Sequence, residues 1–407
     1  MILMKRNKAV LLNEIENTDF LIGDVPLELR PLPVYGDEAC AFLSDLSRAI
    51  MQNQEAKGYP DVISFGYWCR KGNVQKKRDE FLQSRKHSLR VGRGMAFHIA
   101  PSNVPVNFAF SYAFGLLAGN ANVVRVPSKP FPQVKIILDS LRKTLEDHPA
   151  IAARSAFVSY PSSGSATKIF SAHADVRIVW GGDNTIETVR AFLCKPRSKD
   201  IVFSDRYSLA LINGSELESV TDEQMVLLAR RFYNDTYLMD QNACSSPHLV
   251  LWENATEATK DRFWGAVRSY AESEYLLQPA IVMDKYVKLC EDVLDGITDG
   301  SNVAFDGLVT VVELGSLPGS IEDIRGKGGY FYQIDDIGFD DLASCLTEKT
   351  QTLVYFGYDA EKLGKAVVLA GMHGIDRIVP IGSAMDIDVI WDGYDLIGEM
   401  SRIIDVS

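Results

Sequence analysis

Short apolar runs alternate with stretches of helical periodicity along most of the chain after Arg93. The apolar runs predict strands, and apolar residues three and four positions apart predict amphipathic helices between them. The predicted strands are 95–100, 122–126, 155–160, 176–180 and 200–203, and the predicted helices are 106–117, 133–145, 166–172 and 186–193. This alternation is typical of βαβ units, and therefore of a parallel sheet covered by helices.

A second series of strands and helices begins after Ser208 and predicts a second α/β domain. Its strands are expected at 209–212, 248–252, 303–305, 309–314 and 351–356, and its helices at 222–234, 256–270, 280–294 and 360–372. We divide the chain into a first domain at 1–207 and a second at 208–385. The first domain has a helical lead-in, with one capped amphipathic helix expected between Gly36 and Gly58. Residues 386–407 are expected to return to the first domain or to form an oligomer interface.

The span 94–124 contains no charged side chain and is the one candidate for a membrane crossing. It also holds two prolines and several asparagines, which a bilayer helix of about 20 residues tolerates poorly. We therefore expect a buried strand, a turn and a helix there, and no membrane span.

The composition narrows the classes of partner. With 54 acidic and 42 basic residues the formal charge is −12, which makes nucleic acid a poor partner. Residues 70–93 carry a net positive charge, opposite to that of the whole chain, because they contain nine Lys or Arg and two acids. A solvated helix face and contact with an anionic partner both fit that stretch.

The six cysteines show no metal-ligand spacing, so no metal site is expected. The first residues lack the features of a secretory signal, and cysteines are few for the length, so a cytoplasmic location with reduced thiols is predicted.

Three loops at predicted strand ends have the composition of ligand-binding turns, although the common nucleotide and hydrolase signatures are absent. Asn103 stands between two prolines, which suits an oxyanion donor; an N-cap of the next helix is the alternative. Gly181 and Gly182 precede a helix, which suits a phosphate or a simple capped turn. Arg125, Ser128 and Lys129 at a strand end suit a phosphorylated ribose, although surface charges give the same pattern.

Cys244 is the cysteine with polar neighbours, in the run Gln-Asn-Ala-Cys-Ser-Ser-Pro at 241–247. It follows a predicted helix and precedes a predicted strand. A buried structural thiol and a catalytic nucleophile both remain open on this pattern alone.

Taken together these loops resemble the aldehyde dehydrogenase superfamily, and their sequence motifs are most similar to those of acyl-CoA reductases of the LuxC type. The stretches 98–107, 123–128 and 241–247 carry the resemblance, together with 374–382, 384–386 and 390–394. It implies an aldehyde-dehydrogenase-like α/β fold with a Rossmann-type cofactor domain and a catalytic cysteine domain.

The resemblance also implies a reaction. Cys244 would accept the acyl group from acyl-CoA or an acyl-enzyme, and a nicotinamide hydride would reduce the thioester to the aldehyde. Asn103 and the N–H of Cys244 would hold the oxyanion. The turn at Gly181 and Gly182, together with Asp183 and the helix that follows, would face the pyrophosphate. Ser163 and Gly164 would lie near the adenosine. An acyl-protein synthetase partner and a homo-oligomer are implied as well.

Two departures from the superfamily pattern refine these expectations. NAD-preferring members often carry a glutamate after the Pro-Ser pair, whereas this chain has Lys129, so NADPH is predicted. The segment 201–209 also lacks the glutamate base of hydrolytic members, with Asp205 the nearest carboxylate, which favours acyl reduction over hydrolysis. His98 and His248 are more simply explained as structural than as bases.

Two other functions stay open. One is a CoA-acylating or semialdehyde-type dehydrogenase acting on a short substrate. The other is an acyltransferase or acyl-carrying module that uses the cysteine without reductase activity.

Overall fold

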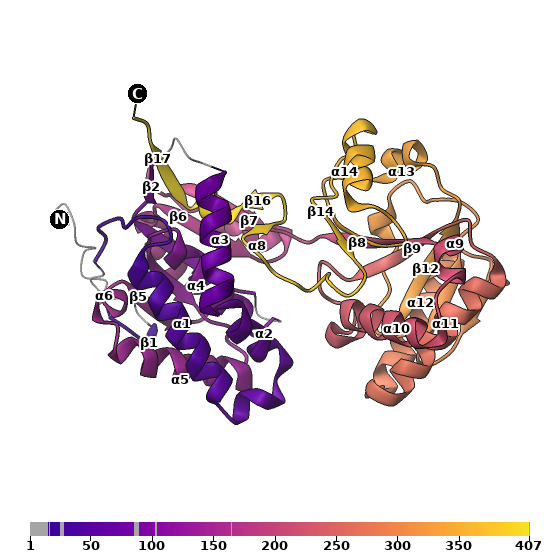
Figure 1. Ribbon diagram of the computed structural model, residues 1–407, viewed down its shortest axis with the longest axis horizontal. Helices are drawn as coiled ribbons and strands as arrows, with labels where there is room; N and C mark the ends of the chain where they lie inside the picture. Colours follow the sequence, from indigo (N-terminus) through magenta and orange to yellow (C-terminus); the bar gives the residue numbers. More distant parts are fainter. Residues whose placement is uncertain are drawn as a thin grey trace. The chain divides into compact units, whose positions relative to one another are not determined.

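The computed structural model describes residues 15, 17–24, 28–84, 89–101, 104–163 and 165–406. The chain forms two compact units, one containing the described residues up to Ser204 together with Tyr394 onward, and the other Asp205–Gly393. Both are mixed α/β structures built on parallel sheets (Figure 1), which confirms the predicted fold class. The assignment of cofactor binding to the first unit and catalysis to the second stays a prediction.

The first unit contains a sheet with helices on both faces. The strands of this sheet are β1 (Asp19–Ile22), β3 (Met95–Ile99), β4 (Ala121–Arg125), β5 (Ser155–Ser159), β6 (Val176–Trp180) and β7 (Lys199–Phe203). Outside it, the first unit contains β2 (Leu89–Gly92), β16 (Tyr394–Asp395) and β17 (Ser401–Ile404), and β2 pairs with β17. Its helices are α1 (Asp37–Gln52), α2 (Pro60–Trp68), α3 (Lys71–Gln83), α4 (Asn107–Leu117), α5 (Pro132–Glu146), α6 (Pro149–Ala152), α7 (Ala166–His173), α8 (Asp183–Arg190) and α15 (Leu396–Glu399), with a 3-10 turn at Glu55–Gly58.

The strand order in the first sheet is β1-β5-β4-β3-β6-β7 among the described residues. All neighbours from β5 to β7 are parallel, and β1 is added antiparallel at the edge. The chain runs outward from β3 to β4 and β5, then crosses back to β6 on the other side of β3. Doubly wound sheets bind ligands where the strand order reverses, which in this sheet is at the carboxyl ends of β3 and β6.

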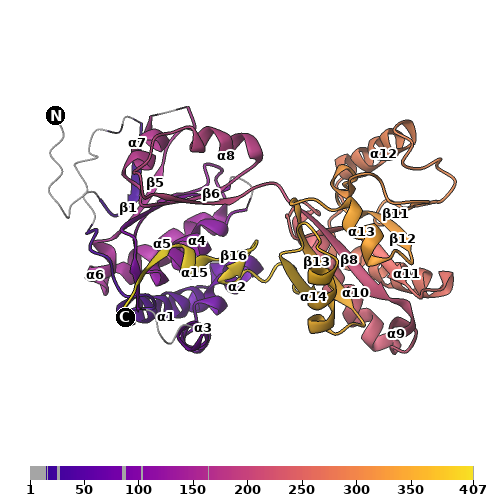
Figure 2. The ribbon, with the colours of Figure 1, turned by 90° about the horizontal axis from the view of Figure 1, so that it is seen from above.

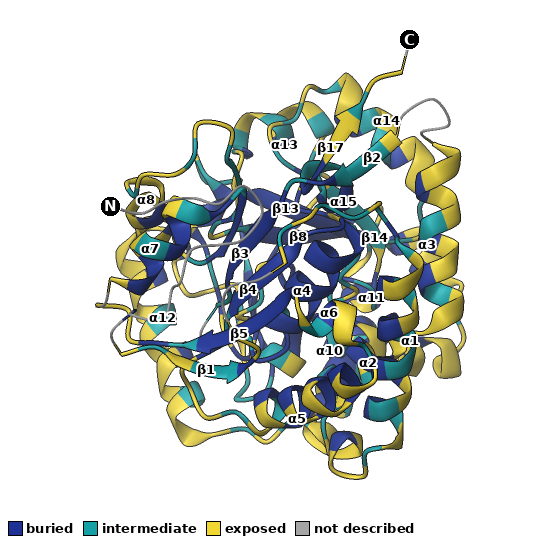
Figure 3. Cartoon of the chain, turned by 90° about the vertical axis from the view of Figure 1, so that its left-hand side faces the viewer, coloured by how far each residue is buried: buried dark blue, intermediate teal, exposed yellow. Residues whose placement is uncertain are grey.

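Alternate residues of β3 enter two different cores, because successive side chains of a strand point to opposite faces. Met95, Phe97 and Ile99 pack with residues of α7 and α8, whereas His98 meets Ser111 of α4. Figure 2 shows α7 and α8 on one side of the sheet and α4, α5 and α1 on the other. The strands β3, β4 and β5 are almost entirely buried (Figure 3). Both faces being covered explains their nearly continuous apolar sequence.

The second unit contains a seven-stranded sheet, within the described residues, in the order β10-β11-β12-β9-β8-β13-β14. The strands of this sheet are β8 (Tyr207–Asn213), β9 (Pro247–Glu253), β10 (Val303–Phe305), β11 (Thr310–Glu313), β12 (Tyr330–Asp335), β13 (Thr350–Phe356) and β14 (Arg377–Pro380). The second unit also contains the short strand β15 (Ile390–Trp391), which is not part of this sheet. Its helices are α9 (Gly214–Glu218), α10 (Asp222–Thr236), α11 (Glu257–Glu274), α12 (Pro279–Leu294), α13 (Phe339–Cys345) and α14 (Ala360–Leu369), with 3-10 turns at Tyr237–Met239 and Ile321–Asp323. Helices α10 and α11 pack on one face, and α13 and α14 on the other.

Four predicted helices differ clearly from the structure at their ends. Helix α11 ends at Glu274 rather than at 270. The pattern between Gly36 and Gly58 covers two elements, because α1 ends at Gln52 and a separate 3-10 turn follows. Helix α8 begins at Asp183, directly after the glycines, rather than at 186. Helix α14 ends at Leu369, and the left-handed Gly371 follows it.

The uncharged span divides into β3, the 11-residue helix α4 and β4, as predicted. Across the described part of the chain, no helix has the length and hydropathy that a bilayer crossing requires.

Candidate functional site

The first sheet gathers the predicted cofactor residues at one edge. Loops follow β3 at 100–106, β4 at 126–131, β5 at 160–165 and β6 at 181–182. Because these four strands are parallel, all four loops leave from their carboxyl ends. Topology therefore brings together segments that are up to 80 residues apart in the sequence.

The loops after β3 and β6 lie where the strand order of the first sheet reverses. Asn103 and Gly164 lie outside the described residues. The helix after the first loop has Val106 at its N-cap and no side-chain cap among the described residues. The chain makes a further turn at 104–106 before α4 begins, with the N–H of Asn107 3.4 Å from the Val104 carbonyl.

The glycine turn after β6 leads directly into α8. Gly182 is the N-cap residue, with an ordinary φ of −65°. A Cβ built at Gly182 would meet nothing within 4 Å, so neither backbone strain nor internal packing requires glycine there. Gly182 stands at the N-terminus of α8, and the open space beside it lets a phosphate approach the backbone closely. Asp183 is exposed at the first helical position, where its carboxylate already complements the helix dipole.

The cations after β4 are placed differently from one another. Arg125 is half-buried, with its guanidinium 4.6 Å from the centre of the Tyr160 ring and Nη2 donating to the Tyr160 carbonyl at 3.2 Å. Ser128 and Lys129 are exposed on the following loop, and Ser163 is exposed on the loop after β5. Lys129 is therefore better placed than Arg125 to meet a ligand phosphate, because Arg125 is committed to Tyr160.

Cys244 lies in the second unit, between η2 (Tyr237–Met239) and β9, and it is exposed. Its loop opens with two residues of positive φ, Asp240 at 50° and Gln241 at 60°. This conformation is uncommon for residues other than glycine, so the surroundings must hold it in place.

Gln241 provides that support. It is 1% exposed, and its amide makes four hydrogen bonds. Nε2 donates to the carbonyls of Pro247 (3.2 Å) and Tyr330 (3.1 Å), and Oε1 accepts from the N–H groups of Gly329 (2.9 Å) and Tyr330 (3.1 Å). The loop is thereby tied to β9 and to the start of β12.

Groups from several parts of the second unit influence the ionisation of the Cys244 thiol. Desolvation by the surrounding protein raises the pKa of the Cys244 thiol above its ordinary value, although part of the residue is accessible. The backbone N–H of Arg206 bonds to the thiol and lowers its pKa, as does the charge of Arg325, while Asp205 and Asp392 raise it. Asp205 forms an ion pair with Arg325 at 2.8 Å.

Both histidines singled out in the sequence are buried and neutral. His98 lies 2.7 Å from Ser111 Oγ and 3.0 Å from Asn122 Oδ1, and burial lowers its pKa to about 4. His248 stacks on Tyr207, and burial lowers its pKa to about 3. These contacts favour the structural interpretation of each.

Sequence reasoning missed the groups that hold the cysteine in place: Arg206, Ser208, Arg325 and Asp392. Arg206 and Ser208 stand two residues apart in the segment 201–209, which the sequence analysis considered only for its missing glutamate. Arg325 and Asp392 come from later parts of the chain, and neither has a local signal that connects it with the cysteine. Gln241 stood in the quoted cysteine motif, but only the structure gives it a role.

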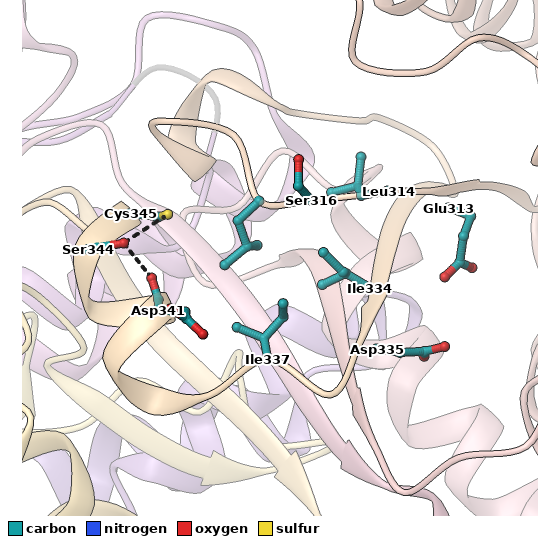
Figure 4. Close-up of a pocket in the computed structure, with 11 residues that line it drawn as sticks. Glu313, Leu314, Ser316, Ile334, Asp335, Ile337, Asp341, Ser344 and Cys345 are labelled. Atoms are coloured by element: carbon teal, nitrogen blue, oxygen red, sulfur yellow. Dashed lines mark hydrogen bonds between the residues drawn. The ribbon is translucent and has the colours of Figure 1, made fainter.

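The second sheet has a pocket of about 560 Å³ at the carboxyl ends of its strands β11 and β12 (Figure 4). It is lined by residues at the carboxyl ends of β11 and β12 and by α13, among them Glu313, Asp335 and Cys345. Cys244 precedes the amino end of β9, which runs parallel to β12. The pocket is therefore separate from the candidate nucleophile. Among the described residues, no group of three or more His, Cys, Asp or Glu is placed to hold a metal ion.

Comparison with solved structures supports the fold. Aldehyde dehydrogenase 21 from Physcomitrella patens matches with a TM-score of 0.61 and 14% identity, over 90% of this chain and 85% of that one. An NAD-dependent benzaldehyde dehydrogenase from Corynebacterium glutamicum matches at 0.59 and 12%, over 98% and 97%. Glyceraldehyde-3-phosphate dehydrogenase GapN from Methanocaldococcus jannaschii, solved with NADP, matches at 0.58 and 14%, over 90% and 88%. The fold is that of the aldehyde dehydrogenases.

Sequence comparison identifies the family. A curated relative, the long-chain acyl-protein thioester reductase of Aliivibrio fischeri, is 25% identical over 182 residues, which is 42% of this chain. The match spans only 36% of the relative's own length. The family model for acyl-CoA reductase (LuxC) matches residues 74–288, more than half of the chain. The chain therefore belongs to the LuxC family of acyl-CoA reductases.

Proposed function

We propose that this protein reduces a fatty acyl thioester to the fatty aldehyde with NADPH, through an acyl group carried on Cys244. The observation that carries the proposal is an accessible cysteine in a backbone held by Gln241, in a chain of the LuxC family. A nucleophile needs both accessibility and a fixed position.

The reaction divides into two transfers at one sulfur. The Cys244 thiolate attacks the acyl carbonyl, the bond to the donor sulfur breaks, and the donor leaves as a thiol once it is protonated. A hydride then adds to the carbonyl of the enzyme thioester, and the carbon–sulfur bond breaks to release the aldehyde and regenerate the thiolate. NADPH, when bound, supplies the hydride.

Each transfer places negative charge on the carbonyl oxygen. We propose that Asn103 and the N–H of Cys244 stabilise it, since preorganised donors are the most effective means of doing so. No glutamate stands in 201–209, and the nearest carboxylate, Asp205, is paired with Arg325. Without a base to activate water, the thioester survives until hydride transfer.

The first unit has features that fit a phosphorylated dinucleotide. The open space beside Gly182 suits the pyrophosphate, and the exposed Ser128 and Lys129 suit the 2′-phosphate. Ser163 and Gly164 are proposed for the adenosine end. Because Lys129 carries the discrimination in this scheme, Lys129→Glu should weaken NADPH binding about tenfold and leave NADH binding little changed. Fluorescence titration of both cofactors measures this, and equal losses for the two would contradict the assignment.

Intact mass spectrometry tests the whole proposal. The protein is incubated with a long-chain acyl-CoA, and an adduct of one acyl group is expected that NADPH, but not buffer, discharges with release of aldehyde. Cys244→Ala should form no adduct, and Cys290→Ala, which removes another exposed cysteine, should behave as the wild type. An undiminished adduct on Cys244→Ala would overturn the proposal.

The same assay separates the alternatives. Turnover confined to short acyl groups favours a CoA-acylating dehydrogenase, and an adduct that NADPH never discharges favours an acyl-carrying module. Comparing acyl-CoA with an acylated protein as donor tests for an acyl-protein synthetase partner. The cytoplasmic location and the homo-oligomer stay predictions.

A further inference from the structure

Two atoms of Cys244 are held by one short segment at the start of β8. The backbone N–H of Arg206 bonds to the sulfur, and Ser208 Oγ donates to the Cys244 carbonyl at 2.7 Å. Ser208 Oγ in turn accepts the N–H of Thr352 at 3.3 Å. The position of the sulfur therefore depends on where the backbone of residue 206 lies.

The side chain of Arg206 anchors that backbone. Nε lies 3.0 Å from Asp392 Oδ1, Nη2 lies 3.7 Å from Asp376 Oδ2, and Nη1 donates to the Glu348 carbonyl. The side chain is only 15% exposed. A planar guanidinium engaged along several directions has little freedom to rotate, so it fixes the residue that carries it.

Asp392 is costly for the fold in two ways. It is 2% exposed, and it has a φ of +53°, which is uncommon for a residue other than glycine. Apart from Arg206, its contact is Gln351 Nε2, which donates to Oδ1 at 2.8 Å. A buried carboxylate in a strained backbone is retained where its pairing has a use, and its partner here is Arg206.

We propose that Arg206 and Asp392 form a positioning pair, which aims the Arg206 N–H at the Cys244 sulfur and thereby stabilises the thiolate that attacks the acyl donor. The pair acts through the peptide backbone and touches no substrate. The inference rests on the proposed function in that Cys244 is the nucleophile. The charged groups that act on the thiol are Asp205 and Asp392, which disfavour the thiolate, and Arg325, which favours it.

The test is the pH dependence of alkylation of Cys244 by iodoacetamide in the full-length protein. Trypsin releases residues 232–260, in which Cys244 is the only cysteine, so mass spectrometry reports this thiol alone. Arg206→Ala should move the alkylation midpoint upward and slow alkylation at pH 8 about fivefold. Arg206→Lys, which keeps the charge but loses the fork, should lie between Arg206→Ala and the wild type.

Asp392→Ala separates positioning from simple charge. Removing a negative charge near the thiol would by itself favour the thiolate and speed alkylation. Loss of positioning has the opposite sign, so we expect slower alkylation. The control is Arg268→Ala, which breaks the 2.8 Å ion pair with Asp306 in the same unit and should leave the alkylation profile unchanged.

Faster or unchanged alkylation of Asp392→Ala, or an unchanged midpoint in Arg206→Ala, would overturn the proposal. So would a shift of equal size in Arg268→Ala. If circular dichroism shows that an alanine variant is unfolded, Arg206→Lys decides: slower alkylation supports the pair, and an unchanged rate overturns it. Alkylation needs neither acyl-CoA nor NADPH, so a protein that forms no acyl adduct but shows these shifts contradicts only the proposed function.

Discussion

Cys244 shares its accessibility with two other cysteines, Cys194 and Cys290. What distinguishes it is the combination of a hydrogen bond at its sulfur, from the N–H of Arg206, and one at its carbonyl, from Ser208. The polar neighbours in the sequence pointed to Cys244, but the hydrogen-bond donors come from a segment nearly 40 residues earlier. Chemistry at this thiol is therefore set by residues that its own motif does not contain.

The raised pKa of the Cys244 thiol has a consequence for acylation. The thiolate is the nucleophile, and burial raises the pKa of the Cys244 thiol above its ordinary value. We expect the rate of acylation by acyl-CoA to rise about tenfold per pH unit between pH 7 and 8.5. Single-turnover acylation followed by mass spectrometry measures this. A rate that levels off below pH 8 would show that the thiol pKa is not raised.

Gln241 should be more important for stability than its polar character suggests. Gln241→Ala leaves two carbonyls and two N–H groups without their partner in a buried place, which should lower the free energy of unfolding by about 3 kcal/mol. Urea denaturation measures the loss. Asn242→Ala is the matched control, because the neighbouring amide is exposed and should cost below about 1 kcal/mol. Equal losses in the two variants would contradict the role given to Gln241.

At the scale of elements, continuous apolar runs were reliable guides. The predicted strands between residues 95 and 203 match β3 to β7 to within one residue at each end. Strands covered on both faces need apolar side chains at every position, so their sequence signal is strong.

Strands β12 and β14 were not predicted. Three glycines at 326, 328 and 329 precede β12, and they indicate a turn rather than a strand. β12 exists because β11 and β9 pair with it on either side. The strand's own residues, Tyr-Phe-Tyr-Gln-Ile-Asp, do favour a strand, so the sequence carried a signal that the preceding glycines obscured.

A buried histidine in β3 should make the first unit sensitive to acid. The native pKa of His98 is about 4, below the ordinary 6.5, so between these values the unfolded chain binds a proton that the native state does not. Stability should therefore be lost as the pH falls through this window, by about 1.4 kcal/mol per pH unit for this one group. His98→Gln should unfold with a shallower pH dependence between 6.5 and 4.5. Chemical denaturation at several pH values measures the two slopes, and identical slopes would contradict the prediction.

At the scale of the whole molecule, the two units divide the proposed chemistry. One has a doubly wound sheet whose strand order reverses between β3 and β6, and the other has the cysteine at the amino end of β9. The net charge of −12 gives no indication of the exposed Lys129 or of the arginines around Cys244. Average charge describes the surface as a whole, whereas binding depends on the local field.

NADPH should stabilise the chain unevenly. At a concentration one hundred times its dissociation constant, a ligand that binds only the native state adds about 2.7 kcal/mol to its stability. In hydrogen exchange we expect new protection in the loops at 126–131, 160–165 and 181–183, and none in α12 of the second unit. Protection confined to the second unit would contradict the assignment of the cofactor to the first.

The sequence by itself determined the α/β class, most of the strands, the polar motif around Cys244 and the likeness to acyl-CoA reductases. These follow from local periodicity and from short motifs, which can be recognised in the sequence without knowing which distant residues are in contact. Only the tertiary structure decided that Arg206, Ser208 and Asp392 surround Cys244, that Gln241 braces its loop, and that Arg125 is occupied by Tyr160. Such contacts join residues tens to well over a hundred positions apart, and their energies depend on burial and direction, which arise only when the chain has folded.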